Sequence, residues 1–576
     1  MMEQNKPKRK KSNQMQVLKT TPIKKISTLC LFFSTFILTS NAQKVPESMG
    51  VVVNTEYSEL NPVIAPDGKT FYFGRKNHPQ NKFGVAGTET VKGSQDIWFS
   101  ENIMGAWSTA RRMSEILNRD QYNTILSVSP DGQTILLKGS YVNGQYDARG
   151  FSITQKNEFS WDIPVKVNIP KYNKMSKGQN EYAFLSNDGK TILMAFSEDK
   201  KSDEDDIYAT FKNKDGSWSE IIGLGSDINT NYTETTPFLA ADGKTMYFSS
   251  NRPGGLGNND IYVTKRLDET WINWSEPINI GSPINTDAYD AYYSVAAAGD
   301  YAYFVSDKNS LGKKDIFRLK LDSQNILFDT TKIIASNNPN KSKSNKKTLS
   351  SNDKNAVQNN TDNNKVAEPV VLLSGKIIDA KTGKVPQNAS VIYEDLSTGK
   401  EIGTAKPDPQ TGKYTIVLPY GKNYGITAKG KGIIASSQNL DLRKIKAGYL
   451  ELSDKDITTT PLEQGAKVTM NNIFFEFGKA TLKSESFTEL NRIADLLKEN
   501  PDTRIEIGGH TDDVGTDEVN NKISLERADA VKSYLLEQKI NVKRIDSKGY
   551  GKMQPKVPNT SPENQAINRR VEFKIL

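Results

Sequence analysis

Short runs of alternating apolar and polar residues, each followed by a turn signal, fill the first half of the chain. Asp-Gly pairs recur at residues 67–68, 131–132, 188–189 and 242–243, with a weaker copy at Ala298-Gly299. Each pair lies between apolar or alternating runs. Such a pair predicts a β-hairpin, because the turn needs a residue with positive φ. The pattern therefore predicts a series of hairpins over residues 48–321.

Two further markers divide the same region into repeats. Asp-Ile-aromatic triplets stand at residues 96–98, 206–208, 260–262 and 315–317, and Trp-Ser pairs begin at Trp107, Trp218 and Trp274, with Trp161 near its expected place. The second copy is degenerate and has residues 150–153 in place of the triplet. The repeats span roughly 55 residues with about four strands each, which is the pattern of propeller blades.

The repeats resemble the PD40 family of WD40-like propellers, which is also seen in the TolB periplasmic protein. The resemblance implies a β-propeller of five blades, or six if the chain ends build another, that binds partners on a face or at its central channel. We expect the repeated Asp, Trp and Tyr residues to form turns and to pack the blades. The acidic run at residues 202–206 lacks calcium-loop spacing, and we expect a solvated loop there.

Strand and helix periods alternate in the last part of the chain. We expect strands at residues 473–477, 505–507, near 545 and at 571–575, and helices over residues 487–497 and near 525–536. Strands alternating with helices predict a compact α/β layer. Asp512 then lies in a loop that leaves a strand, and Arg527 lies in the helix after that loop, so the fold can bring an anion and a cation to one rim.

The motif around these two residues is specific. It comprises Gly509-His510-Thr511-Asp512, Gly515, Asn520, residues 523–528 (Ile-Ser-Leu-Glu-Arg-Ala) and residues 568–571 (Asn-Arg-Arg-Val). In spacing and order it resembles the OmpA-like peptidoglycan-binding domain, over residues 466–576. The resemblance implies that Asp512 holds the ammonium and Arg527 the carboxylate of diaminopimelate in the cell-wall stem peptide. It implies further ligand contacts from Thr511, Asn520 and Arg569.

Two residues of this region qualify the resemblance. Gly478 stands where the family usually has an aspartate after its first strand, which puts a secondary ligand contact in doubt. His510 is expected to hold the strand end by hydrogen bonds rather than to act as a base.

Two segments separate the repeats from the C-terminal domain. Residues 335–368 are rich in Asn, Lys, Ser and Asp and nearly free of apolar residues, a composition that predicts a disordered tether. Residues 370–452 resemble the carboxypeptidase regulatory-like domain, on the strength of residues 374–386, 389–393 and 412–419. That resemblance implies a non-catalytic, transthyretin-like β-sandwich that serves as a spacer.

The beginning of the chain predicts export. Basic residues precede an apolar run at 26–38, and Ser40-Asn41-Ala42 offers a cleavage site, so residues 1–42 read as a signal peptide. Translation could start at Met15 instead of Met1. Cys30 lies early in the apolar run, whereas a lipidated cysteine should close it, which argues against lipidation. We expect a protein of the periplasm or the outer membrane.

Composition removes several classes of function. The single cysteine, Cys30, lies in the predicted leader, and His78 and His510 are the only histidines, so thiol catalysis, a histidine metal site and a Ser-His-Asp triad are all disfavoured. The net charge of +8 is modest for 576 residues and argues against nucleic-acid binding. We expect no catalytic residues, no metal and no cofactor.

The sequence as a whole predicts a non-enzymatic envelope protein that is anchored to peptidoglycan and presents a propeller to a protein partner. The domain order also resembles the cell-wall-anchoring subunit of the type IX secretion machinery, although that subunit's helical repeats are absent. Two alternatives are a propeller-based periplasmic hydrolase, for which no nucleophile motif is found, and an integral barrel, for which the strands carry too much charge.

Overall fold

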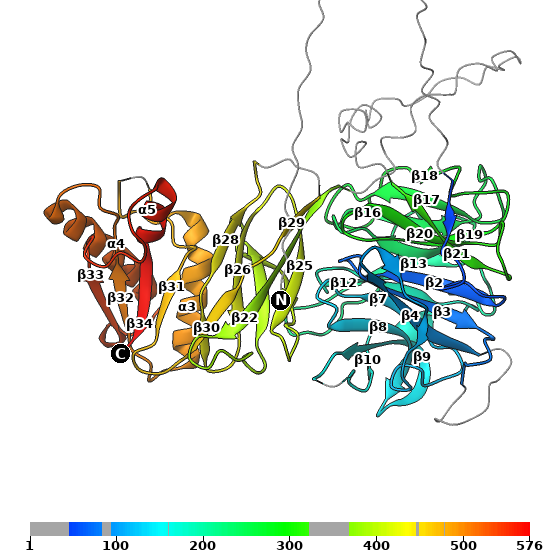
Figure 1. Cartoon of the computed structure of the whole chain (residues 1–576), viewed down its shortest axis with the longest axis horizontal. Coiled ribbons are helices and arrows are strands. Elements are labelled where there is room, and N and C mark those ends of the chain that lie inside the picture. The colour runs from blue at the N-terminus through cyan, green and yellow to red at the C-terminus, as the bar shows by residue number, and fades with distance from the viewer. Residues whose placement is uncertain (1–44, 83–93, 159, 322–367, 445–448, 477) are drawn as a thin grey trace, which may run out of the picture. The chain divides into compact units, whose positions relative to one another are not determined.

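The computed structural model describes residues 45–576 except 83–93, 159, 322–367, 445–448 and 477 (Figure 1). The predicted signal peptide, with Met15 and Cys30, lies outside the described residues, and so does nearly all of the predicted tether. Strands dominate, and helices are few. None of the helices in these described ranges is long and apolar enough to cross a membrane.

Five antiparallel sheets follow one another between residues 47 and 320. The first contains β2 (Ser58–Ile64), β3 (Thr70–Lys76), β4 (Gln95–Ile103), β5 (Ala106–Trp107) and β6 (Arg111–Arg112). The second contains β7 (Ile125–Val128), β8 (Thr134–Val142), β9 (Gln145–Gln155) and β10 (Val165–Lys166), with helix α1 (Tyr172–Met175) after it. The third contains β11 (Tyr182–Leu185), β12 (Thr191–Phe196), β13 (Asp206–Phe211) and β14 (Ile222–Gly223). The fourth contains β15 (Glu234–Leu239), β16 (Thr245–Ser250), β17 (Asp260–Lys265) and β18 (Ile278–Asn279). The fifth contains β19 (Asp290–Val295), β20 (Tyr301–Ser306), β21 (Asp315–Lys320) and the early strand β1 (Glu47–Ser48).

These sheets form a closed ring, which we call the five-sheet ring. The first strands of the sheets contact one another in the order β2, β7, β11, β15 and β19, and β19 contacts β2 again. Strand β1, from the start of the described chain, pairs with β21 from the end of the ring. The chain therefore closes the ring by completing its last sheet with its first strand.

A side-chain clasp repeats between neighbouring sheets. The amide oxygen of Asn54 accepts a hydrogen bond from Ile316 N (3.0 Å), and its Nδ2 donates to Ile316 O (2.9 Å). Asn118, Asn229 and Asn285 hold the isoleucines of the earlier Asp-Ile triplets in the same two-way manner. Because Asn54 and Ile316 stand at opposite ends of the ring, this clasp reinforces the closure made by β1.

The Asp-Gly pairs form the predicted hairpins. Gly68, Gly132, Gly189, Gly243 and Gly299 all have φ between 66° and 71°, and each lies between the first and second strands of a sheet. The preceding aspartates support the turn; Asp67 Oδ1, for example, accepts a hydrogen bond from Lys69 N (2.9 Å). Four of the tryptophans pack between third and fourth strands, with Trp161, Trp218 and Trp274 buried. The repeated residues thus have the turn and packing roles predicted for them.

The prediction of a solvated loop at residues 202–206 is wrong at its end. Asp206 begins strand β13. Asp205 is fully buried, and its carbonyl accepts a hydrogen bond from Glu234 N of the next sheet (2.7 Å). Burial is the main cause that raises the pKa of Asp205 to about 7. No hydrogen bond within normal geometry reaches either carboxylate oxygen from the described residues.

This buried carboxyl should make stability depend on pH. A folded-state pKa of about 7, above the ordinary 3.8, means that the folded chain holds a proton that the unfolded chain releases. The contribution of Asp205 to stability is therefore complete below pH 4 and is lost as the pH rises through 7. We expect Asp205→Asn to raise the thermal midpoint at pH 8 but not at pH 4. Equal midpoints of variant and wild type at pH 8 would contradict this.

Residues 370–461 form a separate pair of sheets, which we call the two-sheet domain. One sheet contains β22 (Val370–Asp379), β25 (Lys413–Pro419), β27 (Ile433–Ala435), β29 (Leu450–Leu452) and β30 (Ile457–Pro461). The other contains β23 (Ser390–Asp395), β24 (Lys400–Ala405), β26 (Asn423–Lys429) and β28 (Gln438–Asp441). Buried residues of both sheets, such as Val371, Tyr393, Tyr414 and Tyr424, share one core. The domain extends past the predicted end at residue 452, because β30 pairs with β22 and β27.

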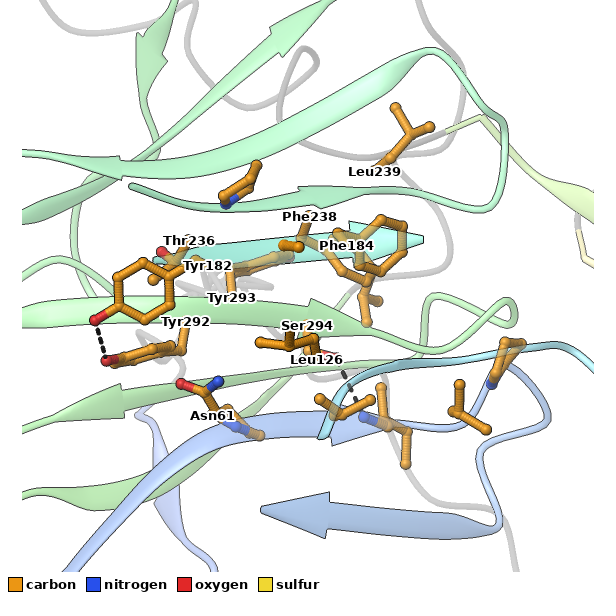
Figure 2. A pocket seen from close by; sticks show the side chains of 18 of the residues that line it. Asn61, Leu126, Tyr182, Phe184, Thr236, Phe238, Leu239, Tyr292, Tyr293 and Ser294 are labelled. Atoms are coloured by element: carbon orange, nitrogen blue, oxygen red, sulfur yellow. Dashed lines mark hydrogen bonds between the residues drawn. The ribbon is translucent and has the colours of Figure 1, made fainter. Parts of the chain in front are cut away.

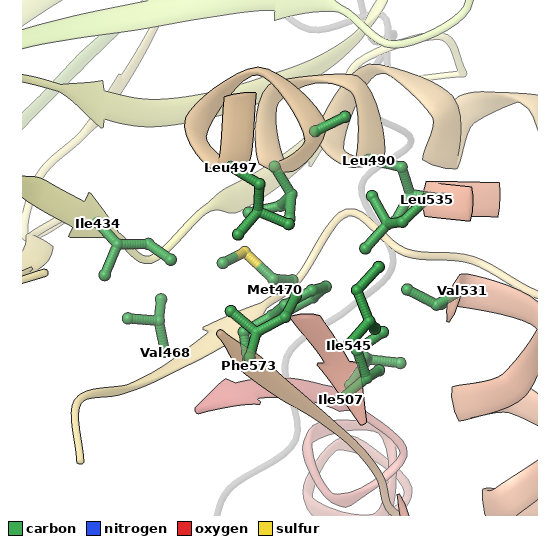
Figure 3. Packing of buried hydrophobic residues seen from close by; sticks show 14 of the residues in the cluster. Ile434, Val468, Met470, Leu490, Leu497, Ile507, Val531, Leu535, Ile545 and Phe573 are labelled. Atoms are coloured by element: carbon green, nitrogen blue, oxygen red, sulfur yellow. The ribbon is translucent and has the colours of Figure 1, made fainter. Parts of the chain in front are cut away.

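The C-terminal domain is the predicted α/β layer. Its sheet has the order β31 (Lys467–Met470), β34 (Val571–Ile575), β32 (Ile505–Gly509) and β33 (Ile545–Gly549). Its helices are α3 (Phe487–Glu499), α4 (Asp517–Glu537) and α5 (Pro562–Asn568), with short 3-10 turns η2 (Ser484–Ser486) and η3 (Val542–Arg544). Figure 3 shows Leu497, Val531 and Leu535 from the helices meeting Ile507 and Phe573 from the sheet in a closely packed core.

Three details of this domain differ from the prediction. The first strand is β31, not residues 473–477, because Phe474 pairs its backbone with Ser486 and Lys483 instead of with a strand of the sheet. Helix α4 begins earlier than predicted, where Thr516 caps it by accepting a hydrogen bond from Val519 N. Helix α5 was not predicted; Ser561 caps it, and Pro562 occupies its first turn.

Candidate functional site

Strand β32 and helix α4 position the candidate site by an unusually close approach. A Cβ atom at Gly509 would lie 2.0 Å from Ser524 O, a distance that no side chain permits. Glycine at this position therefore allows the end of β32 to lie against α4. The three residues that follow, His510, Thr511 and Asp512, are all buried at this junction.

Asp512 forms an ion pair with Arg569. Its Oδ2 lies 2.6 Å from Arg569 Nη1, and its Oδ1 accepts a hydrogen bond from Val514 N (3.2 Å). The Asp512 side chain is 11 % exposed and that of Arg569 43 %, so the carboxylate is fixed while the guanidinium remains open to solvent. A ligand cation that approaches Asp512 must therefore compete with, or displace, Arg569.

Arg527 lies in the same electrostatic environment without a direct salt bridge to Asp512. Its Nε donates to Lys479 O (3.2 Å), and its guanidinium carbon lies 5.0 Å from the centre of the Phe475 ring. Burial lowers the pKa of Arg527, the charge of Arg569 lowers it further, and Asp512 partly offsets both. Asp512 thus contacts the guanidinium group of Arg569 and interacts with that of Arg527 at longer range. The three residues together carry a net positive charge.

Thr511 and Asn520 add unpaired polar atoms. Both residues are buried, yet Thr511 Oγ1 and Asn520 Nδ2 have no hydrogen-bond partner among the described residues. A buried polar atom normally has a partner, because leaving it unpaired costs free energy. One hydroxyl and one amide nitrogen are therefore unpaired and shielded from solvent.

The predicted role of His510 needs revision. Its backbone N–H does hold the strand end, by donating to Arg570 O (3.0 Å). Its ring instead stacks on Tyr550, with centroids 5.0 Å apart, and Nε2 lies 3.6 Å from Glu572 Oε2. That separation is longer than a normal hydrogen bond. His510, together with Arg570, lowers the pKa of Glu572 to about 2, so this carboxylate stays charged beneath the site.

The sequence missed the residues that hold Arg527. Lys479 contacts Arg527 through its backbone carbonyl, which no residue pattern can reveal. Phe475 contacts it through its ring, whereas the sequence predicts a strand there. Gly478, the departure from the family pattern, has φ 67° and directly precedes Lys479. A left-handed residue at that point suits glycine and helps the loop to place the Lys479 carbonyl against Arg527.

The structure brings three of the five residues predicted from the motif into one charged group. Asp512 and Arg569 are paired directly, and Arg527 is coupled to both through their charges. Thr511 adjoins Asp512 in the chain, and Asn520 lies in the first turn of the helix that carries Arg527. The arrangement offers one fixed anion, two cations and two unpaired polar atoms, which suits a ligand that carries both an ammonium and a carboxylate.

Comparison with known proteins finds relatives of this domain. Outer membrane porin F of Pseudomonas fluorescens is 36 % identical over 115 residues, which are 20 % of this chain and 35 % of the relative. The peptidoglycan-binding protein ArfA of Mycobacterium bovis is 38 % identical over 108 residues, 19 % of this chain and 33 % of the relative. The chain thus spans about a third of the length of these curated relatives.

A solved structure and a family model each match part of the chain. The peptidoglycan-associated lipoprotein from Burkholderia pseudomallei is 27 % identical, with 18 % of this chain and 88 % of that chain covered and a TM-score of 0.18. The model of the OmpA family matches residues 474–569, which contain Thr511, Asp512, Asn520, Arg527 and Arg569. Residues 474–569 of this chain therefore form an OmpA family domain.

Proposed function

We propose that this protein is a non-enzymatic component of the cell envelope that anchors itself to peptidoglycan through its C-terminal domain. The observation that carries the proposal is the convergence of Asp512, Arg527 and Arg569 with unpaired atoms of Thr511 and Asn520. This group lies within an OmpA family domain, and one relative of that domain is named as a peptidoglycan-binding protein.

The proposed ligand is diaminopimelate in the stem peptide. Its side chain ends in an ammonium and a carboxylate on one carbon. Asp512 takes the ammonium, and Arg527 takes the carboxylate through charge-assisted hydrogen bonds. Arg569, whose Nη1 lies 2.6 Å from Asp512 Oδ2, yields that carboxylate to the ligand ammonium.

The remaining domains complete the proposal. The closed contact order of the five-sheet ring supports a five-bladed β-propeller of the PD40 type, and we infer that it presents a face to a protein partner. The two-sheet domain would act as a spacer of the carboxypeptidase regulatory-like type. The protein would be exported and reside in the periplasm or at the outer membrane. Support of a type IX secretion assembly is a further part of this proposal.

Co-sedimentation with purified sacculi tests the anchoring role. The full chain is incubated with sacculi that contain diaminopimelate, and the pelleted fraction is measured against a sample without sacculi. We expect most of the protein to pellet, and an excess of soluble diaminopimelate-containing stem peptide to release it. Protein that stays in the supernatant at every sacculus concentration would remove the anchoring function.

A further inference from the structure

The centre of the five-sheet ring contains a small cavity of about 60 Å³. It lies between the first strands of all five sheets, as Figure 2 shows for β2, β7, β11, β15 and β19 residues. Its walls are aromatic and aliphatic, with Phe184, Phe238 and Tyr293 among them. None of the described residues that line it is charged, whereas charged residues make up 25 % of the chain.

Three strands reach the cavity through strained bulges. Asn61, Thr236 and Tyr292 have φ of 51°, 49° and 61°, and each stands at the register shift of its strand, β2, β15 and β19. Left-handed φ is unusual for threonine and tyrosine, which lack the tolerance of glycine or asparagine. Because left-handed φ recurs at three equivalent positions, it is a regular feature of the ring. β-Bulges and backbone strain of this kind concentrate at binding sites.

The rim of the cavity supplies neutral hydrogen-bonding groups. The hydroxyls of Tyr182 and Tyr292 lie 3.1 Å apart and share one hydrogen bond, and Tyr292 also hydrogen-bonds Tyr289, so the rim carries a group of neutral hydroxyls (Figure 2). The amide of Asn61 makes no hydrogen bond to another described residue and is half-buried. These side chains are only partly exposed, so a ligand group placed among them would lose most of its contact with water.

We propose that this cavity receives one uncharged side chain, with an apolar body, from a loop of a protein partner. A charged group would be desolvated here without a counter-charge, which is costly. The volume holds about four or five waters at roughly 10–15 Å³ each, so it admits the end of a side chain and not a nucleotide. So small a contact binds weakly alone, which is why the occupant must belong to a polypeptide that also covers the surrounding face. This inference rests on the partner-presenting role proposed above.

Blocked tripeptides test the inference on the full chain. Saturation-transfer NMR measures binding of N-acetyl-Gly-X-Gly-amide peptides in which X is Tyr, Leu, Asp or Lys. We expect the Tyr and Leu peptides to bind with millimolar affinity and the Asp and Lys peptides to bind at least tenfold more weakly. Equal binding of charged and uncharged peptides, or no binding of any peptide, would overturn the inference.

Two variants assign binding to the cavity. Tyr182→Phe removes one rim hydroxyl and should weaken the Tyr peptide about fivefold while leaving the Leu peptide unchanged, a split that a purely structural role would not produce. Asn61→Gly keeps the left-handed backbone and should likewise weaken the Tyr peptide. Tyr146→Phe, at an exposed tyrosine elsewhere on the ring, is the matched control. Unchanged binding in both cavity variants would refute the site.

Sacculus binding separates this inference from the anchoring proposal. All three variants should pellet with sacculi as the wild type does, because the changes lie outside the C-terminal domain. Absence of peptide binding by the wild type with sacculus binding intact would therefore count against the ring cavity and leave the anchoring proposal standing.

Discussion

Replacing Arg527 with alanine should weaken binding of a diaminopimelate-containing stem peptide by about 2–5 kcal/mol, which is roughly 30- to 5,000-fold. The substitution removes the proposed partner of the ligand carboxylate and leaves that carboxylate at a partly buried site. Asp512→Ala should have an effect of the same order, because the ligand ammonium loses its counter-charge. Isothermal titration of the full-length variants measures both effects.

The control variants for this experiment come from the same elements. Asp513→Ala removes the neighbouring, exposed carboxylate, and Lys522→Ala removes an exposed cation from helix α4. Both should bind the peptide within about twofold of the wild type, and circular dichroism should show all variants folded. If the Asp513 and Asp512 variants lose affinity equally, the charge of the loop matters and the specific pairing does not.

Removing the side-chain amide of Asn54 should destabilise the five-sheet ring strongly, beginning at the strands that close it. Asn54→Ala leaves the buried N–H and C=O of Ile316 without partners, at a cost of about 1–3 kcal/mol each, or about 2–6 kcal/mol in total. A loss of that size lowers the thermal midpoint by about 5–15 °C for a domain of this size. Hydrogen exchange should show the first increase in β1 and β21, the two strands that close the ring.

Asn229→Ala is the matched control, because it removes the same clasp between sheets that are adjacent in the chain. It should lower the midpoint by a similar amount but accelerate exchange near Ile207 rather than in β1 and β21. A variant at Asn54 with the midpoint of the wild type, or with exchange increased evenly over the ring, would show that the clasp does not maintain closure.

The hairpins of the ring could be predicted because their signal is local. An Asp-Gly pair specifies a turn within a few residues, and the structure confirms all five hairpins. The asparagine clasps could not be predicted, because Asn54 meets Ile316 across 262 positions of sequence. The strained positions Asn61, Thr236 and Tyr292 also escaped notice, since no local preference of threonine or tyrosine favours left-handed φ.

In the C-terminal domain, too, elements with a local sequence signal could be predicted, whereas long-range contacts could not. The amphipathic period of α3 and the alternation of β34 were read correctly, whereas residues 473–477 looked like a strand because their aromatic residues suit one. Their backbone instead pairs with Ser486 and Lys483. The motif identified five site residues, but it gave no sign that Arg569 pairs with Asp512, because that contact depends on the end of α5.

The proposed function depends most on binding of the ligand carboxylate by Arg527, and one thermodynamic cycle tests this contact. Lysine differs from diaminopimelate by the absence of that carboxylate, so stem peptides with either residue form a matched pair. Isothermal titration of wild type and Arg527→Ala with both peptides gives four affinities. We predict that the wild type binds the lysine peptide at least 30-fold more weakly, and that the variant binds both peptides within about twofold. A wild type that binds both peptides equally, or a variant that still discriminates between them, would contradict the account.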